Sequence, residues 1–223
     1  MIIAEWKPIP ELIETVREYE RILLVGCATC VAECAAGGER EVETLAPLMR
    51  MGCAASGSSL EVVTRTLERQ CEWEFVEALA PLIGGVEAVV SLACGIGVQT
   101  VAERFPEATV YPGVNTTSLA VRAEAGLWLT RCAACGDCRL GETFGLCSVS
   151  RCAKSLANGP CGGTRPDGRC EVDVDKDCVW QQIVRRAMDR DALQRLMEVR
   201  PAKDWSGGCH GEPIRMVKED HQA

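Results

Sequence analysis

The chain has 223 residues, of which 15 are cysteine and only 4% are aromatic. Its net charge is −8 and its pI is near 5.0, so a nucleic-acid backbone, which attracts basic surfaces, is not the expected partner. The first residues, MIIAEWKPIPELIETVREYE, lack a basic segment followed by a long apolar run, and neither a signal peptide nor a membrane anchor is predicted. In the reducing cytoplasm that we therefore expect, clustered thiols are more often metal ligands or redox groups than disulfides.

Short apolar runs alternate with helical patterns over the first two-thirds of the chain. Helices are predicted over residues 11–20, 41–51, 73–83 and 98–105, and strands over residues 21–25, 59–67, 86–93 and 108–113. Apolar strands that alternate with helices are typical of a parallel sheet covered by helices on both faces. We therefore predict a Rossmann-like or flavodoxin-like α/β domain in residues 1–128.

A change in composition begins at Cys132. Residues 132–178 hold eight cysteines, many glycines and few apolar residues, so this segment cannot build a core of its own, and metal–thiolate bonds are the expected source of order. Residues 179–200 predict a helix or a helix pair. The polar tail from Lys203 onward is predicted to be extended, with Trp205 either as a docking anchor or exposed in a disordered segment. Residues 129–223 are thus predicted to form a cysteine-rich, loop-dominated, metal-binding lobe with C-terminal helices.

The first thiol group follows predicted strands of the α/β domain. The stretch LVGCATCVAEC carries Cys27, Cys30 and Cys34 directly after one apolar strand, and Cys94 follows another. Ligands bind beyond the carboxyl ends of parallel strands, so if the two strands are neighbours their loops offer four thiolates, a full set for one iron–sulfur cube. Zinc also accepts four thiolates. Alternatively, Cys94 is only a small buried residue.

The second thiol group occupies the lobe. CAACGDC, with Cys132, Cys135 and Cys138, reproduces the C-x2-C-x2-C core of bacterial ferredoxin loops. Five more cysteines follow: Cys147, Cys152, Cys161, Cys170 and Cys178. Eight thiols satisfy two four-thiolate sites, or one site with four structural cysteines, and spacing does not decide which four belong together. A structural zinc ribbon is the alternative.

The remaining motifs point away from an independent catalyst. Packing or loop roles are predicted for Cys53 and Cys71, and the adjacent Cys209 and His210 are weak support for a metal site. No G-x-S-x-G, H-E-x-x-H or phosphate-loop motif is present. The chain is therefore predicted to be an electron carrier or a binding subunit.

The motifs CAACGDC, NGPCGG, GRCEV and DCVW together resemble the methylenetetrahydrofolate reductase C-terminal domain family. The resemblance to that family extends to the N-terminal cysteines, which are Cys27, Cys30, Cys34 and Cys94. Ser148 departs from the pattern, because proline is expected after Cys147 as in other cluster motifs.

The resemblance implies a small, non-catalytic iron–sulfur subunit of a heterodimeric reductase that acts in one-carbon metabolism by the Wood–Ljungdahl route. Two 4Fe-4S clusters are expected, with zinc as an alternative at one of them, and FMN in the TIM-barrel partner subunit only. The chain would relay electrons from a donor such as ferredoxin or a larger redox complex to that FMN, for reduction of methylenetetrahydrofolate to methyltetrahydrofolate. The alternatives are a zinc-stabilised scaffold subunit without redox function, and a corrinoid- or folate-binding module.

Overall fold

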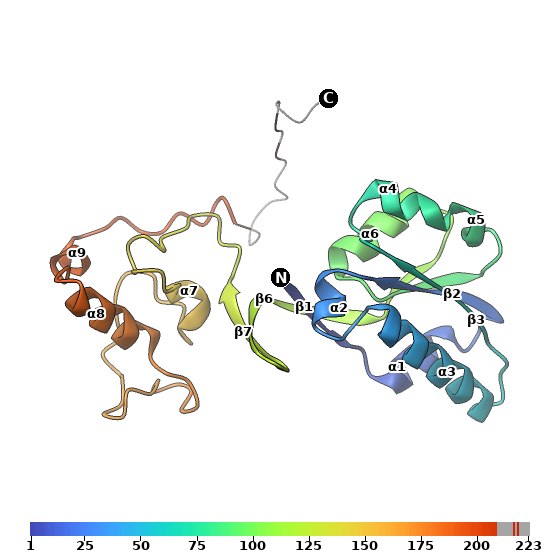
Figure 1. Cartoon of the computed structure of the whole chain (residues 1–223), viewed down its shortest axis with the longest axis horizontal. Coiled ribbons are helices and arrows are strands. Elements are labelled where there is room, and N and C mark those ends of the chain that lie inside the picture. Colours follow the sequence, from blue (N-terminus) through green and yellow to red (C-terminus); the bar gives the residue numbers. More distant parts are fainter. Residues whose placement is uncertain (209–215, 217, 219–223) are drawn as a thin grey trace. The chain divides into compact units, whose positions relative to one another are not determined.

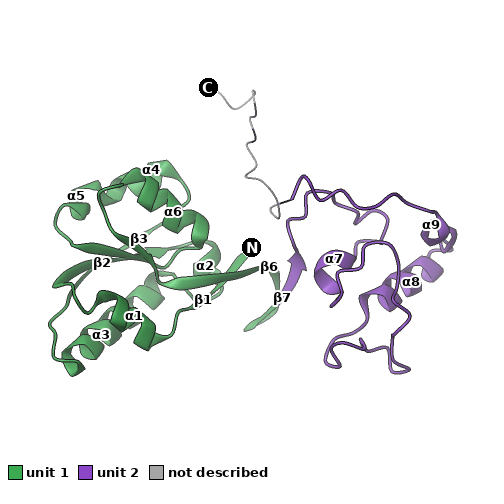
Figure 2. Cartoon of the chain, turned by 180° about the vertical axis from the view of Figure 1, so that it is seen from behind, with its two compact units in different colours: residues 1–128 green, residues 129–223 purple. Residues whose placement is uncertain are grey.

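The computed structural model describes residues 1–208, 216 and 218, and the chain forms two compact units, residues 1–128 and residues 129–223 (Figure 2). Each unit has an apolar core of its own. The pair formed by Cys209 and His210 lies outside the described residues.

Unit 1 contains a four-stranded parallel sheet with the strand order β3-β2-β4-β5. Its strands are β2 (Arg21–Cys27), β3 (Glu61–Leu67), β4 (Ala88–Ser91) and β5 (Val110–Pro112). Because β3 and β4 flank β2 on opposite sides, the strand order reverses at β2, and such a point opens a crevice at the carboxyl ends of the strands. The predicted α/β class is confirmed.

Helices cover both faces of this sheet (Figure 1). Leu24 of β2 packs into a core with α1 (Ile9–Val16) and α3 (Glu39–Ala55). Leu23, on the other face, packs with α4 (Trp73–Val76), α5 (Ala80–Ile83) and α6 (Gly95–Arg104). A helix predicted over residues 73–83 is broken here, because η1 (Glu77–Leu79) separates α4 from α5. One further short helix, α2 (Cys30–Glu33), follows β2.

A second sheet was not expected. Its order is β1-β6-β7, formed by β1 (Ile2–Trp6), β6 (Val114–Glu124) and β7 (Leu127–Cys132), and β1 pairs with β6 in the antiparallel direction. In β6 only Val114 and Ala120 are buried, so the strand shows no strict alternation of apolar and polar residues. The division between the two units falls within β7.

Unit 2 consists mostly of loops, with three helices among its described residues. These are α7 (Ser148–Arg151), α8 (Val179–Asp189) and α9 (Gln194–Met197). The buried core comprises Phe144, Leu146, Val179, Trp180, Ile183 and Ala187. Four of these six residues lie on α8, so the cysteine-rich segment contributes little apolar burial, as predicted.

Residues 203–208 are mostly exposed but lie against the loop of residues 132–138. Lys203 is buried, and a Cβ atom added at Gly136 would lie 2.1 Å from the carbonyl carbon of Gly207. Gly136 also has a φ of +79°, which favours glycine. Trp205 is 41% exposed, so these residues lie at the surface while packing on the loop of residues 132–138, and their docking role stays a prediction.

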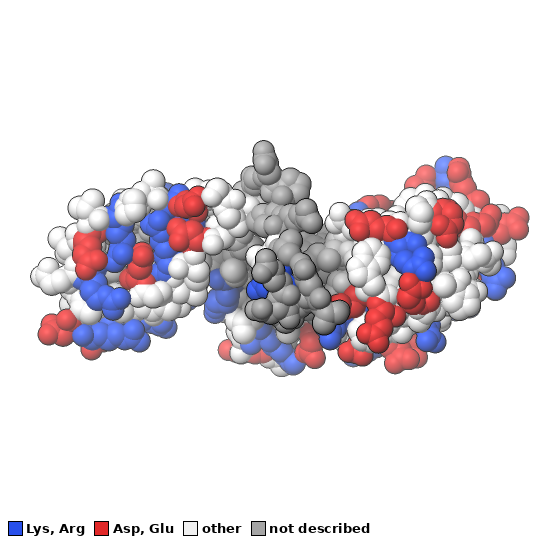
Figure 3. Space-filling view, turned by 90° about the horizontal axis from the view of Figure 1, so that it is seen from above, with Lys and Arg blue, Asp and Glu red and all other residues white. Residues whose placement is uncertain are grey.

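Acidic and basic side chains are mixed on the face of each unit seen in Figure 3. Within the part of the chain that the structure describes, no helix combines the length and the hydropathy needed to cross a membrane.

Candidate metal centres

Cys27 and Cys94 lie at the carboxyl ends of adjacent strands. The strands β2 and β4 pair directly, with Val25 opposite Ser91, so the condition on which the shared thiol site was predicted is met. Cys27 is the last residue of β2, and Cys94 is the residue that precedes the first turn of α6. Both side chains are buried. The structure therefore brings these two predicted ligands to the same edge of the sheet.

The loop that carries Cys30 and Cys34 folds back over this edge. The backbone amide of Cys27 donates a hydrogen bond to the carbonyl of Gly37 at 2.7 Å. A Cβ atom at Gly37 would lie 2.0 Å from the carbonyl oxygen of Leu92, so only glycine fits between β2 and the end of β4. The indole of Trp6 donates to the carbonyl of Ala36 at 2.7 Å and holds the loop against β1.

Cys34 contacts β1. The amide of Ala4 donates to its Sγ atom at 3.5 Å, and the thiol lies 3.6 Å from the carbonyl oxygen of Ala4. Burial raises the pKa of the Cys34 thiol. Spacing alone did not reveal this contact, which joins residues 30 positions apart.

Cys71 reaches the same edge from the loop between β3 and α4. Its side chain is exposed. Desolvation by the surrounding protein raises the pKa of its thiol, and the charges of Cys27 and Cys94 raise it further. The preceding residue, Gln70, is hydrogen-bonded to the carbonyls of Val25 and Gly26 at the end of β2. In contrast, Cys53 is buried in the apolar core of unit 1, as its predicted packing role requires.

Four cysteines of unit 2 line one pocket, which we call the wide pocket. They are Cys132, Cys135, Cys138 and Cys147, and the volume is about 200 Å³. Backbone amides donate to two of the sulfurs: Ala134 to Cys132 at 3.3 Å, and Ser150 to Cys147 at 3.4 Å. Hydrogen bonds of this kind stabilise the thiolate form of cysteine.

Two basic residues accompany the wide pocket. Lys203 is buried in its wall and lies 3.5 Å from the carboxylate of Asp137. Arg139, also in the wall, contacts the same carboxylate at 3.0 Å and lowers the pKa of Asp137. The role of Lys203 was missed in the sequence, because nothing local connects it with cysteines more than 50 residues earlier.

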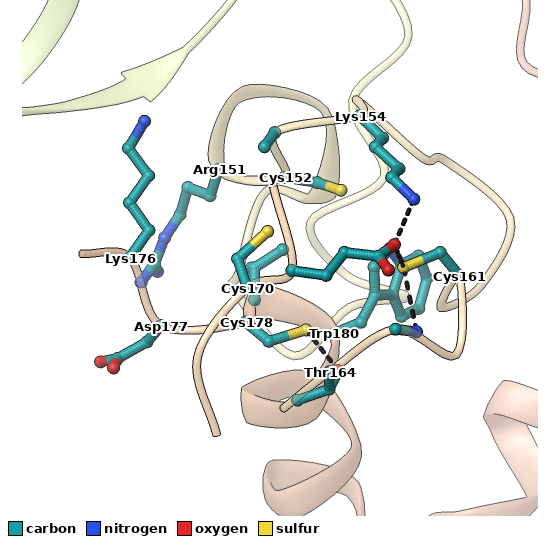
Figure 4. A pocket seen from close by; sticks show the side chains of 14 residues that line it. Arg151, Cys152, Lys154, Cys161, Thr164, Cys170, Lys176, Asp177, Cys178 and Trp180 are labelled. Atoms are coloured by element: carbon teal, nitrogen blue, oxygen red, sulfur yellow. Dashed lines mark hydrogen bonds and ion pairs between the residues drawn. The ribbon is translucent and has the colours of Figure 1, made fainter. Parts of the chain in front are cut away.

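The other four cysteines of unit 2 line a second pocket, which we call the narrow pocket (Figure 4). They are Cys152, Cys161, Cys170 and Cys178, and the volume is about 20 Å³. The hydroxyl of Thr164 donates to Cys178 Sγ at 3.0 Å, and the amide of Gly163 donates to Cys161 Sγ at 3.4 Å. The eight cysteines are thus divided into two sets of four, a division that spacing left open.

Glu171 occupies part of the narrow pocket. Cys161 Sγ donates to its carboxylate at 3.3 Å, and Lys154 forms an ion pair with the same oxygen, which is also drawn in Figure 4. The ion pair lowers the pKa of Glu171. This residue is a neighbour of the thiols that the cysteine pattern did not indicate.

All 14 cysteines in the described part of the chain have free thiols. Among the same residues, no group of three or more cysteine, histidine, aspartate or glutamate side chains is arranged to hold a single metal ion. The sulfurs share pockets without converging on one point. The wide pocket, with four cysteines in its wall and a volume of about 200 Å³, has room for a group of several atoms.

Comparison with known protein families identifies the region that contains both pockets. A family model described as the methylene-tetrahydrofolate reductase C-terminal region matches residues 111–206. Residues 111–206 are thus similar to the C-terminal region of methylenetetrahydrofolate reductases, and the predicted resemblance is confirmed over these residues.

All eight cysteines of the two pockets, and Lys203, lie within the matched reductase C-terminal region, whereas Cys27, Cys34, Cys71 and Cys94 lie before it. Searches among curated proteins and among solved structures found no match for the chain.

Proposed function

We propose that this chain is the iron–sulfur subunit of a methylenetetrahydrofolate reductase and delivers electrons to the FMN of a partner subunit. The observation that carries the proposal is the wide pocket, in which four thiols surround a volume of about 200 Å³ within the region that matches the reductase family model. Cavities of about 150 Å³ accommodate a molecule as large as benzene, so this pocket has room for a multi-atom group.

The chemistry of the donor set supports a 4Fe-4S cluster in the wide pocket. Four cysteine thiolates are the usual ligands of such a cluster, which supplies one-electron transfer when it is bound. The amides of Ala134 and Ser150 donate to two of the sulfurs, and hydrogen bonds of this kind to the sulfurs tune the reduction potential of a cluster. The buried ammonium of Lys203 offsets part of the negative charge. Cys132, Cys135, Cys138 and Cys147 would therefore hold the group.

The narrow pocket favours a different occupant. A volume of about 20 Å³ has room for little more than one water-sized body, since a water needs roughly 10–15 Å³. Its four thiols form an all-cysteine ligand set that suits a structural zinc ion, and they belong to Cys152, Cys161, Cys170 and Cys178. We assign zinc to this pocket, where the four thiols would have to move together to coordinate one ion because they do not converge on a point in this structure, and a second 4Fe-4S cluster to the thiols at the sheet edge of unit 1.

The metal content of anaerobically purified protein tests these assignments. We expect about eight iron atoms and about eight acid-labile sulfides per chain, together with about one zinc atom. Zinc without sulfide would contradict the electron-transfer function and would favour a scaffold subunit. A pink-red protein with bound corrinoid would instead favour a corrinoid-binding module.

Electron delivery is tested in the complex with the flavin-containing subunit. A low-potential donor should reduce FMN rapidly when the intact chain is bound, and slowly when the bound chain has been depleted of its clusters while remaining folded. Circular dichroism and co-elution of the two subunits serve as controls for folding and for complex formation. Equal rates of flavin reduction would mean that electrons reach FMN directly, and the chain would not be a relay.

A further inference from the structure

The side chain of Gln70 connects the loop of Cys71 with the strands that carry Cys27 and Cys94. Gln70 is fully buried. Its Nε2 atom donates to the carbonyls of Val25 and Gly26, each at 3.0 Å, and these residues directly precede Cys27. The residue before Cys71 is thus bound to the end of β2.

The same side chain also binds the end of β4. The Oε1 atom of Gln70 accepts a hydrogen bond from the hydroxyl of Ser91, the last residue of β4, at 2.7 Å. The Ser91 hydroxyl in turn accepts from the amide of Ala93 at 3.2 Å. Cys94 is the next residue. The side chain of Gln70 therefore holds the backbone at the ends of both β2 and β4, next to Cys27 and Cys94.

Close packing brings the loop of Cys71 against the first turn of α6. A Cβ atom added at Gly97 would lie 2.8 Å from the Cβ atom of Gln70 and 2.7 Å from that of Ala93. No side chain larger than hydrogen fits there, and the backbone of the loop lies directly on the helix that begins after Cys94.

Cys34 is held in another direction. Its sulfur accepts from the amide of Ala4 and also lies 3.5 Å from the carbonyl of Val31. These contacts place it in the apolar core beside β1, where it packs as a partly buried hydrophobic residue. Cys30, the first residue of α2, is partly exposed and remains three residues from Cys27.

We propose that Cys71 is a metal ligand of the sheet-edge site, together with Cys27, Cys30 and Cys94, and that Cys34 is a packing residue. This set differs from the one expected from the C-x2-C-x3-C spacing, in which Cys34 was the third ligand. It rests on the proposed function in that the metal group is taken to be an iron–sulfur cluster.

Iron, sulfide and zinc analysis of full-length variants tests the proposal, together with the electron paramagnetic resonance spectrum of the reduced protein. Cys71→Ala and Cys71→Ser should each lose about half of the iron and sulfide and one of two spectral components. Cys34→Ser should retain the content and spectrum of the unchanged chain. Cys53→Ala, which alters a buried cysteine of the same unit, controls for general damage to the fold.

The outcomes separate this inference from the function on which it rests. If the unchanged chain contains iron and sulfide, but Cys71→Ala keeps all of it or Cys34→Ser loses half, the ligand assignment is overturned and the electron-transfer function stands. If the unchanged chain contains zinc and no sulfide, the function fails. The ligand assignment is then judged on the zinc content of the same variants: a loss in Cys71→Ala that Cys34→Ser does not share supports it, and any other pattern overturns it.

Discussion

Lys203 places a buried positive charge beside the thiols of the wide pocket. Net charge and hydrogen bonding set the reduction potential of a cluster, and a nearby cation stabilises the reduced, more negative state. Lys203→Met should therefore lower the midpoint potential of one cluster by an amount on the order of tens of millivolts. A spectroelectrochemical titration measures the shift.

The control for that experiment is Lys176→Met. Lys176 is an exposed lysine of the same unit, paired with Asp173 at 2.8 Å, and it lines the narrow pocket. Its replacement should leave both midpoint potentials unchanged. Equal shifts in the two variants would show that Lys203 acts only through the net charge of the chain.

Gln70 gives a prediction for the stability of unit 1. In Gln70→Leu the carbonyl of Gly26 loses its Nε2 donor and the hydroxyl of Ser91 loses its acceptor in a buried environment, while the carbonyl of Val25 keeps the amide of Leu92 at 2.8 Å. Unsatisfied buried polar groups cost about 1–3 kcal/mol each, so the free energy of unfolding should fall by at least that amount. Urea denaturation, followed by circular dichroism, measures the change.

Gln99→Leu is the matched control, since Gln99 is exposed and its side chain donates to the carbonyl of Gly95 in the preceding turn of α6. Its effect should stay within about 0.5 kcal/mol. A comparably small effect of Gln70→Leu would mean that its three hydrogen bonds do not hold the strand ends together.

The helix α8 supplies most of the apolar core of unit 2. Ile183 has no exposed surface and packs with Phe144 and Leu146 of the cysteine-rich segment. Removing a buried isoleucine side chain down to alanine costs about 2–5 kcal/mol, a large share of what so small a core provides. Ile183→Ala should therefore increase the proteolysis of unit 2 in the metal-loaded chain.

On the opposite face of α8, Met188 is 63% exposed. Met188→Ala should leave the rate of proteolysis unchanged, because no buried contact is lost. If Ile183→Ala were as resistant as Met188→Ala, the metal–thiolate bonds alone would hold unit 2 together.

The two units differ in what stabilises them. Unit 1 has apolar cores on both faces of its parallel sheet, whereas unit 2 has one small core and two sets of four thiols. Metal binding supplies folding free energy where apolar burial does not. Removal of metal by a chelator should thus unfold unit 2 and leave β2 and β4 of unit 1 protected.

Hydrogen exchange followed by mass spectrometry, with and without chelator, measures this difference peptide by peptide. Peptides of residues 132–178 should lose most of their protection, and those of residues 21–27 should keep it. Unchanged exchange in residues 132–178 would show that unit 2 folds without its metals.

Local patterns were sufficient for the α/β architecture of unit 1. Apolar runs such as RILLV are required wherever a strand is covered on both faces, and the position of Cys27 and Cys94 after such runs places them at one sheet edge once the strands are neighbours. The repeat of Val179, Ile183 and Ala187 likewise predicted α8. These features follow from periodicity, which neighbouring residues alone determine.

Long-range contacts could not be read from the same patterns. The antiparallel sheet depends on pairing between residues more than 100 positions apart, and β6 lacks alternation. Three features depend on how distant loops fold together: the division of eight cysteines into two pockets, the burial of Lys203, and the contacts of Gln70 with the ends of β2 and β4. One spacing of cysteines along the sequence is compatible with several conformations of the loops. Packing against glycines and buried side chains such as Gln70 selects one of these conformations.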